Sequence, residues 1–231
     1  MISRGELSRS DALTRPRRLL FAREPGWQFS LMLALDIVFL FGALPALGSG
    51  DAHRSLVVLL QLILAGIAIV LIAKSAWLRV GLAGSLGLAF LARLLPGLLP
   101  ETTVLGMAFA YNLLVTAAMS AAVFGPGEVN HHRIAGAIFV YLQIALLFAL
   151  AYHALTLANP DTLSGLPAGM HGTGAELIHF SFTTLTAIGD GLIAPQSPFA
   201  RSLADLETVI GHLFPAILLS RLVGLHLSRS L

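Results

Sequence analysis

Long apolar stretches separated by short polar breaks dominate this sequence and constrain its fold more than any other feature. A helix that crosses a membrane needs about 20 mainly apolar residues. Glycine, proline and charged residues cluster between such stretches, for example at 48–51 and 125–128. We therefore predict six membrane-spanning helices, at residues 27–48, 55–73, 79–98, 103–124, 134–157 and 200–226.

The composition excludes the main soluble classes of protein. Charged residues make up only 11% of the chain, whereas a soluble domain carries about 25%. This excludes a soluble globular enzyme and a disordered chain, and the absence of cysteine excludes a disulfide scaffold. No signal peptide fits, because the first apolar run starts too late and is too long. We expect a multi-pass protein of the plasma (inner) membrane, in contact with the lipid bilayer.

The first 26 residues form a basic tail that holds six arginines. Basic residues favour the cytoplasmic side of a membrane, so we expect a cytoplasmic N-terminus, and six spans return the C-terminus to that side. The predicted inner segments hold eleven basic and four acidic residues, and the outer ones two and seven. A net negative outer face concentrates cations. Such a tail could instead bind nucleic acid, but the adjacent span makes us predict no nucleic-acid partner.

The connection between the fifth and sixth predicted spans, residues 158–199, differs from the other loops. Its apolar-leaning segment 175–185 is about three helical turns long and too short to cross a membrane. Glycines follow at 189 and 191, and glycine permits backbone conformations closed to other residues. Non-helical backbone at membrane depth occurs only where it is buried in protein or lines water. We therefore expect a re-entrant helix and a loop whose carbonyl oxygens coordinate cations, in a ring built from several chains.

This segment resembles the pore of the tetrameric potassium-channel superfamily. The family pattern Ser-Phe-x-Thr-x-Thr-Thr-Val-Gly-Tyr-Gly-Asp-x-x-Pro aligns without a gap to residues 181–195, which read Ser-Phe-Thr-Thr-Leu-Thr-Ala-Ile-Gly-Asp-Gly-Leu-Ile-Ala-Pro. The resemblance extends over 134–226, and Arg201 and Gly211 stand where simple bacterial channels carry an arginine and a hinge glycine. It implies an all-α homotetramer that conducts ions passively and needs no cofactor. The implied filter residues are Thr186, Ala187, Ile188, Gly189, Asp190 and Gly191.

Three departures from the family pattern bear on selectivity. Ala187 replaces the filter threonine, Asp190 the filter tyrosine and Leu192 the following aspartate. A Gly-Asp-Gly filter is similar to that of the non-selective sodium–potassium (NaK-type) channels, which implies outer sites widened into a vestibule. A tyrosine would brace the filter against its pore helix, whereas an aspartate is too short, and Asp190 would also attract a divalent cation. We predict a monovalent cation channel that discriminates weakly between K⁺ and Na⁺. A potassium-selective pore and a non-conducting membrane scaffold with a degenerate pore stay open as alternatives.

The last span carries the candidates for a gate. Gly211 and Pro215 are one helical turn apart, and together they predict either a hinge or a static kink. His212 is expected to face the inner cavity, where it would make conduction sensitive to pH. Asp205 and Glu207, nearer the outer end, would either brace the filter from behind or contribute to the outer negative field.

The fourth predicted span contains no arginine, although voltage sensing needs several there. Residues 27–126 are therefore predicted to form a four-helix bundle that does not sense voltage, between the basic tail 1–26 and a pore domain at 127–231. Asp36 and Arg93 lie within the spans, and we expect them to form a structural pair. We expect no ligand-binding domain after the last span, so regulation by a soluble ligand would need a separate protein.

No combination of residues predicts an enzyme or a resident metal ion. The sequence has no His-Glu-x-x-His helix and no phosphate-binding loop. His131 and His132 beside Glu128 offer too few ligands for a metal site. His153 and His212 would have to face each other to hold a haem, but their predicted depths in the membrane differ.

Overall fold

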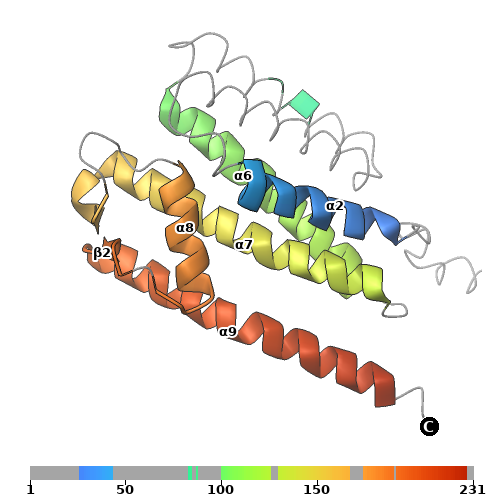
Figure 1. Ribbon diagram of the computed structural model, residues 1–231. Helices are drawn as coiled ribbons and strands as arrows, with labels where there is room; N and C mark the ends of the chain where they lie inside the picture. The colour runs from blue at the N-terminus through green and yellow to red at the C-terminus, as the bar shows by residue number, and fades with distance from the viewer. Residues whose placement is uncertain are drawn as a thin grey trace, which may run out of the picture.

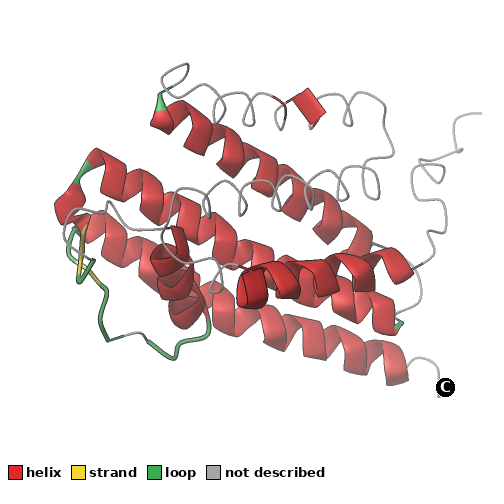
Figure 2. Ribbon diagram, turned by 45° about the horizontal axis from the view of Figure 1, so that its top comes forward, coloured by secondary structure: helices red, strands yellow, loops and turns green. Residues whose placement is uncertain are grey.

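The computed structural model describes residues 26–43, 83–84, 87, 100–125, 130–166, 174–189 and 191–227, and helices dominate these residues (Figure 2). The helical elements are α2 (Trp27–Ile37), the π-helix η1 (Val38–Ala43), α6 (Glu101–Phe124), α7 (His131–Ala158), the 3-10 helix η2 (Pro160–Thr162), α8 (Gly174–Leu185) and α9 (Pro198–Leu227). Two short strands, β1 (Leu163–Ser164) and β2 (Ala194–Pro195), form an antiparallel pair.

Three of the described helices are long and apolar enough to cross a membrane: Glu101–Phe124, His131–Ala158 and Pro198–Arg221. They coincide with the fourth, fifth and sixth predicted spans. The shorter apolar helix Trp27–Gly42 coincides with the first. The predicted spans 55–73 and 79–98 lie outside the described residues, apart from 83–84 and 87. The protein is therefore a mostly helical, multi-pass membrane protein.

Helix α7 is the centre of the arrangement, because α2, α6, α8 and α9 all pack against it (Figure 1). One hydrophobic cluster joins Met32 of α2, Met119 of α6 and Phe139 of α7, and Phe214 of α9 packs against the same cluster. The described part of the predicted bundle 27–126 thus lies directly on the first helix of the predicted pore domain.

Local capping explains where two of the long helices begin. The side chain of Asn130 accepts a hydrogen bond from the backbone N–H of Arg133 (2.9 Å), so α7 starts three residues before the predicted span. Helix α9 starts at Pro198, a residue suited to the first helical position. The hydroxyl of Ser197 accepts from the N–H of Ala200 (3.2 Å) just before it.

Two arginine side chains form hydrogen bonds with backbone carbonyl groups at the end of α6, next to the start of α7. The carbonyl oxygen of Gly125 accepts from Nη1 of Arg133 (3.2 Å) and from Nη2 of Arg221 (3.1 Å). Arg133 also donates to the carbonyl of Ala122 (3.3 Å), and Arg221 lies over the ring of Phe124. Cationic side chains suit helix C-termini, whose last carbonyls lack partners within the helix. Through Arg221, the C-terminal half of α9 therefore contacts the C-terminal end of α6.

Candidate filter and its supporting helices

The short helix α8 lies between α7 and α9, on the half of the bundle that carries the strand pair (Figure 1). Its apolar face, which includes Leu177, Phe180 and Leu185, is buried. Phe180 packs edge-on against Tyr152 of α7 with ring centroids 4.9 Å apart, and Ala200 of α9 belongs to the same cluster. The prediction of a short helix over 175–185 is confirmed.

Helix α8 ends in a Schellman motif that shapes the start of the predicted filter. The N–H of Ile188 donates to the carbonyl of Thr183 (2.9 Å), and the N–H of Ala187 donates to that of Thr184 (3.0 Å). The motif needs a left-handed residue at Ala187, which has a φ of 55°. Glycine usually occupies this position, and a side chain there costs about 1–2 kcal/mol.

The amide groups that follow α8 point back toward the helix. The N–H of Thr186 donates to the carbonyl of Phe182 (3.0 Å), and the N–H of Gly189 donates to that of Thr183 (3.1 Å). Within the described part of the chain, no hydrogen bond ends on the carbonyl oxygens of residues 186–189 or of Gly191. These carbonyl oxygens therefore have no hydrogen-bond donor among the described residues, and Ile188 in this segment is 77% exposed.

The backbone conformation alternates along this segment. The φ angle is positive at Ala187, Gly189 and Gly191 and is not positive at Ile188 between the first two. When left- and right-handed backbone conformations alternate, successive peptide carbonyl groups lie on the same side of the chain. In a β-strand, successive residues instead point to opposite sides. Asp190 lies outside the described residues.

The segment that follows is fastened to the loop before α8. Leu163 pairs with Pro195 and Ser164 with Ala194. The N–H of Gln196 donates to the carbonyl of Thr162 (2.8 Å), and its side-chain amide donates to the Ser164 hydroxyl (2.7 Å). Arg201, noted at a family position, donates from Nε to the carbonyl of Pro195 (3.2 Å). Both ends of the predicted filter are thus attached to structured backbone.

A buried carboxyl group connects the three helices α7, α8 and α9 next to the predicted filter. Glu207 of α9 is 0% exposed, and its Oε2 accepts a hydrogen bond from the hydroxyl of Tyr152 on α7 (2.8 Å). Its Oε1 forms a hydrogen bond with the hydroxyl of Ser181 on α8. Ser181 also donates to the carbonyl of Ala145 on α7 (2.7 Å). Of the two roles considered for Asp205 and Glu207, bracing fits Glu207, whereas Asp205 is exposed.

The predicted gate residues lie in an unbroken helix. Gly211 packs against the carbonyl of Leu185, the last residue of α8. Helix α9 continues through Pro215. His212 is exposed in the single chain, with Nδ1 2.8 Å from the carbonyl of Thr208 in its own helix.

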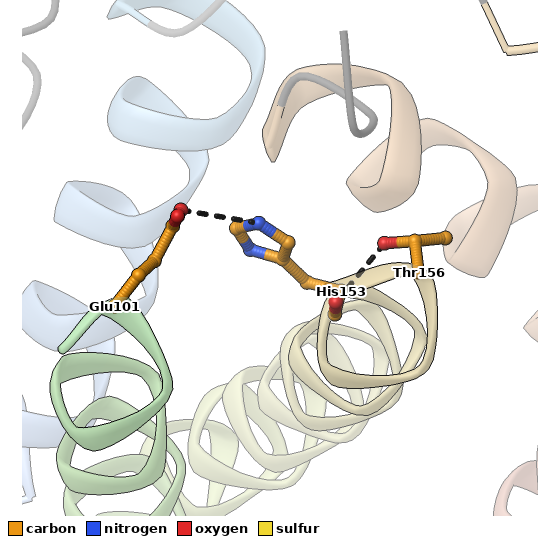
Figure 3. A network of polar contacts seen from close by, with 3 residues as sticks. All are labelled: Glu101, His153 and Thr156. Carbon is orange, nitrogen blue, oxygen red and sulfur yellow. Dashed lines mark hydrogen bonds and ion pairs between the residues drawn. The ribbon is translucent and has the colours of Figure 1, made fainter. Parts of the chain in front are cut away.

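The histidines considered as ligands have other partners. Nε2 of His153 lies 3.8 Å from a carboxylate oxygen of Glu101, so this contact joins α7 to the start of α6 (Figure 3). The hydroxyl of Thr156 donates to the carbonyl of His153 (3.0 Å). His132 is 2.7 Å from the Ser30 hydroxyl through Nδ1. Among the residues that the structure describes, no group of three acidic, histidine or cysteine side chains could hold a metal ion.

Sequence reasoning missed the contacts that involve Tyr152, Ser181 and Arg221. In the sequence, Ser181 belongs to the family pattern, and nothing near Tyr152 or Arg221 indicates their partners. The partners are 26 to 96 positions away along the chain. The one sequence signal for these contacts is the presence of an acid, Glu207, inside the predicted span 200–226.

A short helix lies between two long apolar helices, and among the described residues nothing donates a hydrogen bond to the carbonyl oxygens that follow it. This arrangement is compatible with a channel pore. Residues 140–225 match the family model described as ion channel. The match begins within α7, contains all of α8 and the segment after it, and ends near the end of α9. The matched family is one of ion channels and not of enzymes. Comparison with the curated proteins and with the solved structures gave no match.

Proposed function

We propose that four copies of this chain form a passive channel for monovalent cations that discriminates weakly between K⁺ and Na⁺. The observation that carries this proposal is the row of carbonyl oxygens after α8, which accept no hydrogen bond from any described residue. Rings of carbonyl oxygens replace the hydration shell of a permeating cation. The C-terminal end of α8 adds partial negative charge at the same place. The proposed filter consists of Thr186, Ala187, Ile188, Gly189, Asp190 and Gly191.

An apolar stripe on α9 supports the assembly of several copies. Leu206, Val209, Leu213 and Ile217 are each more than half exposed in the single chain. Their spacing of three and four residues places them on one face of the helix. In a closed cyclic tetramer this stripe would meet neighbouring subunits and the inner cavity beside His212. Gly211 and Pro215 remain the proposed hinge of the gate.

The resemblance of the Gly-Asp-Gly segment to the NaK-type channels supports weak selectivity. The basic tail supports cytoplasmic termini. The same proposal includes six membrane spans and a division of the chain into a tail, a bundle at 27–126 and a pore domain at 127–231. It also includes a divalent ion near Asp190 and a separate regulatory protein.

The test is the reversal potential of the purified tetramer in a planar bilayer, with potassium on one side and sodium on the other. A potential near zero, with current present, is expected for the wild type. Asp190→Tyr should shift it toward the potassium limit, because a tyrosine can brace the filter against its pore helix. Asp161→Tyr is the matched control, since it replaces an exposed acid in the outer loop outside the filter.

Two results would overturn this proposal. A wild-type potential at the potassium limit would mean a potassium-selective pore. Absence of current from an intact tetramer, in the wild type and in both variants, would favour the non-conducting scaffold.

A further inference from the structure

Three hydrogen bonds run in series through the centre of the pore domain. The hydroxyl of Tyr152 contacts one oxygen of Glu207, the other oxygen contacts the hydroxyl of Ser181, and that hydroxyl contacts the carbonyl of Ala145. All four residues are 0% exposed. No bulk water reaches the series, so the side chains themselves must supply every hydrogen in it.

Counting hydrogens determines the state of the carboxyl group. Three hydrogen bonds need three hydrogens, and the carbonyl of Ala145 has none to give. Tyr152 supplies one and Ser181 supplies one. If Ser181 donates to Ala145, the hydrogen between Ser181 and Glu207 must come from Glu207 itself. A neutral carboxylic acid completes the series, whereas an ionised carboxylate leaves one of the three contacts without a hydrogen.

The charges around Glu207 agree with this count. Among the described residues, Tyr152 and Tyr141 are the ionisable groups of α7 near Glu207, Ser181 contacts it from α8, and Asp205 is the nearby acid on α9. None of these groups carries a positive charge at neutral pH. Arg201 on the same helix donates to the carbonyl of Pro195 instead. Burial of an ionised carboxylate without a cationic partner is very costly.

We propose that Glu207 is a neutral carboxylic acid that positions the pore helix α8 by donating its proton to Ser181. Ser181 lies one helical turn before Leu185, at the end of α8 from which the filter extends. A shift of Ser181 therefore shifts the carbonyl row. The predicted effect of Glu207 on conduction rests on the proposed function. Its predicted protonation state does not, because that state does not depend on whether ions permeate.

The first test is infrared spectroscopy of the full-length tetramer in lipid vesicles at neutral pH. The difference spectrum between wild type and Glu207→Gln should show the loss of the carbonyl stretch of a protonated carboxylic acid. Asp205→Asn is the matched control on the same helix, and it should remove carboxylate bands and leave that acid band in place. Loss of carboxylate bands on Glu207→Gln would overturn the proposal, because Ser181 would then share one hydrogen between two acceptors.

The second test compares tracer-cation flux per tetramer in three variants. Glutamine can accept from Tyr152 and donate to Ser181, so Glu207→Gln should change the flux by less than about twofold. Glu207→Leu and Glu207→Asp should each lower it by about tenfold or more, because the first has no polar group and the second is too short to bridge both helices. Equal losses in the glutamine and leucine variants would overturn the positioning role.

The two readouts separate this inference from the proposed function. An acid band in a wild-type tetramer that conducts nothing would contradict the channel and leave the neutral acid intact. In that case, hydrogen exchange of the α8 amides replaces flux as the positioning readout. Protection kept in Glu207→Gln and lost in Glu207→Leu supports the proposal, and equal protection in both overturns it.

Discussion

Gly211 of α9 faces the carbonyl oxygen of Leu185 so closely that a Cβ at position 211 would lie 1.8 Å from that oxygen. The same carbonyl accepts a hydrogen bond from the hydroxyl of Tyr141 (3.3 Å). Four residues earlier on each helix, Glu207 meets Ser181. Successive turns of α9 therefore contact successive turns of α8, and the glycine predicted as a hinge is also the point of closest approach to the pore helix.

Gly211→Ala is expected to destabilise the protein although alanine is the better helix former. The new methyl group would displace backbone and not a flexible side chain, which costs about 1–3 kcal/mol or more in a packed core. The free energy of unfolding in detergent measures this. Gly106→Ala in α6 is the control, since a Cβ there meets no atom within 4 Å, and it should be neutral or gain up to about 1 kcal/mol. Equal effects at both sites would contradict the close approach.

Ala187→Gly is expected to stabilise the end of α8. Glycine adopts the left-handed conformation of Ala187 without a steric penalty, so a gain of about 1 kcal/mol in the free energy of unfolding is expected. Ala187→Val should lose stability, because a β-branched residue is a strong outlier at positive φ. The same alanine-to-glycine change at Ala117, exposed in the middle of α6, should cost about 1 kcal/mol. A loss at both alanines would rule out the left-handed cap.

Arg221→Gln is expected to loosen the far half of α9. The variant loses the hydrogen bond to the carbonyl of Gly125 and the contact with the ring of Phe124. Amide hydrogen exchange in the last turns of α9 should quicken by about three- to tenfold. The neighbouring Ser220→Ala removes only a hydrogen bond within α9, to the carbonyl of Ala216, and serves as the control. Unchanged exchange in Arg221→Gln would mean that this contact does not hold the helix.

Asp36→Asn tests the predicted pair of Asp36 with Arg93, which lies outside the described residues. Asp36 is buried in α2, and its Oδ2 has no hydrogen-bond partner in the described part of the chain. If no cation pairs with this carboxylate, its replacement by a neutral amide should raise the free energy of unfolding by about 1 kcal/mol or more. Breaking a buried ion pair would instead lower it by about 3–5 kcal/mol. Thermal unfolding of the wild type, Asp36→Asn and the exposed-site control Asp205→Asn decides between these outcomes.

The order of the long helices and of the short helix α8 could be predicted from the sequence, whereas η1, η2 and the strand pair could not. Apolar stretches of about 20 residues can only cross a membrane as helices, because every backbone group must be paired within the segment. For this reason the predicted spans 103–124, 134–157 and 200–226 differ from α6, α7 and α9 by only a few residues at each end. The apolar-leaning segment 175–185 likewise predicted α8 to within one residue, and the assignment of residues 186–191 to a filter stays a prediction.

Only the tertiary structure decided which polar groups meet in the interior. Tyr152 and Ser181 are 55 and 26 positions from Glu207, and no local spacing relates them. The left-handed φ of Ala187 comes from the hydrogen bonds that cap α8, and the role of Gly211 comes from the approach of a second helix. The spacing of apolar residues in a segment predicts the secondary structure of that segment. The hydrogen-bond partners of a buried side chain depend on how the helices pack.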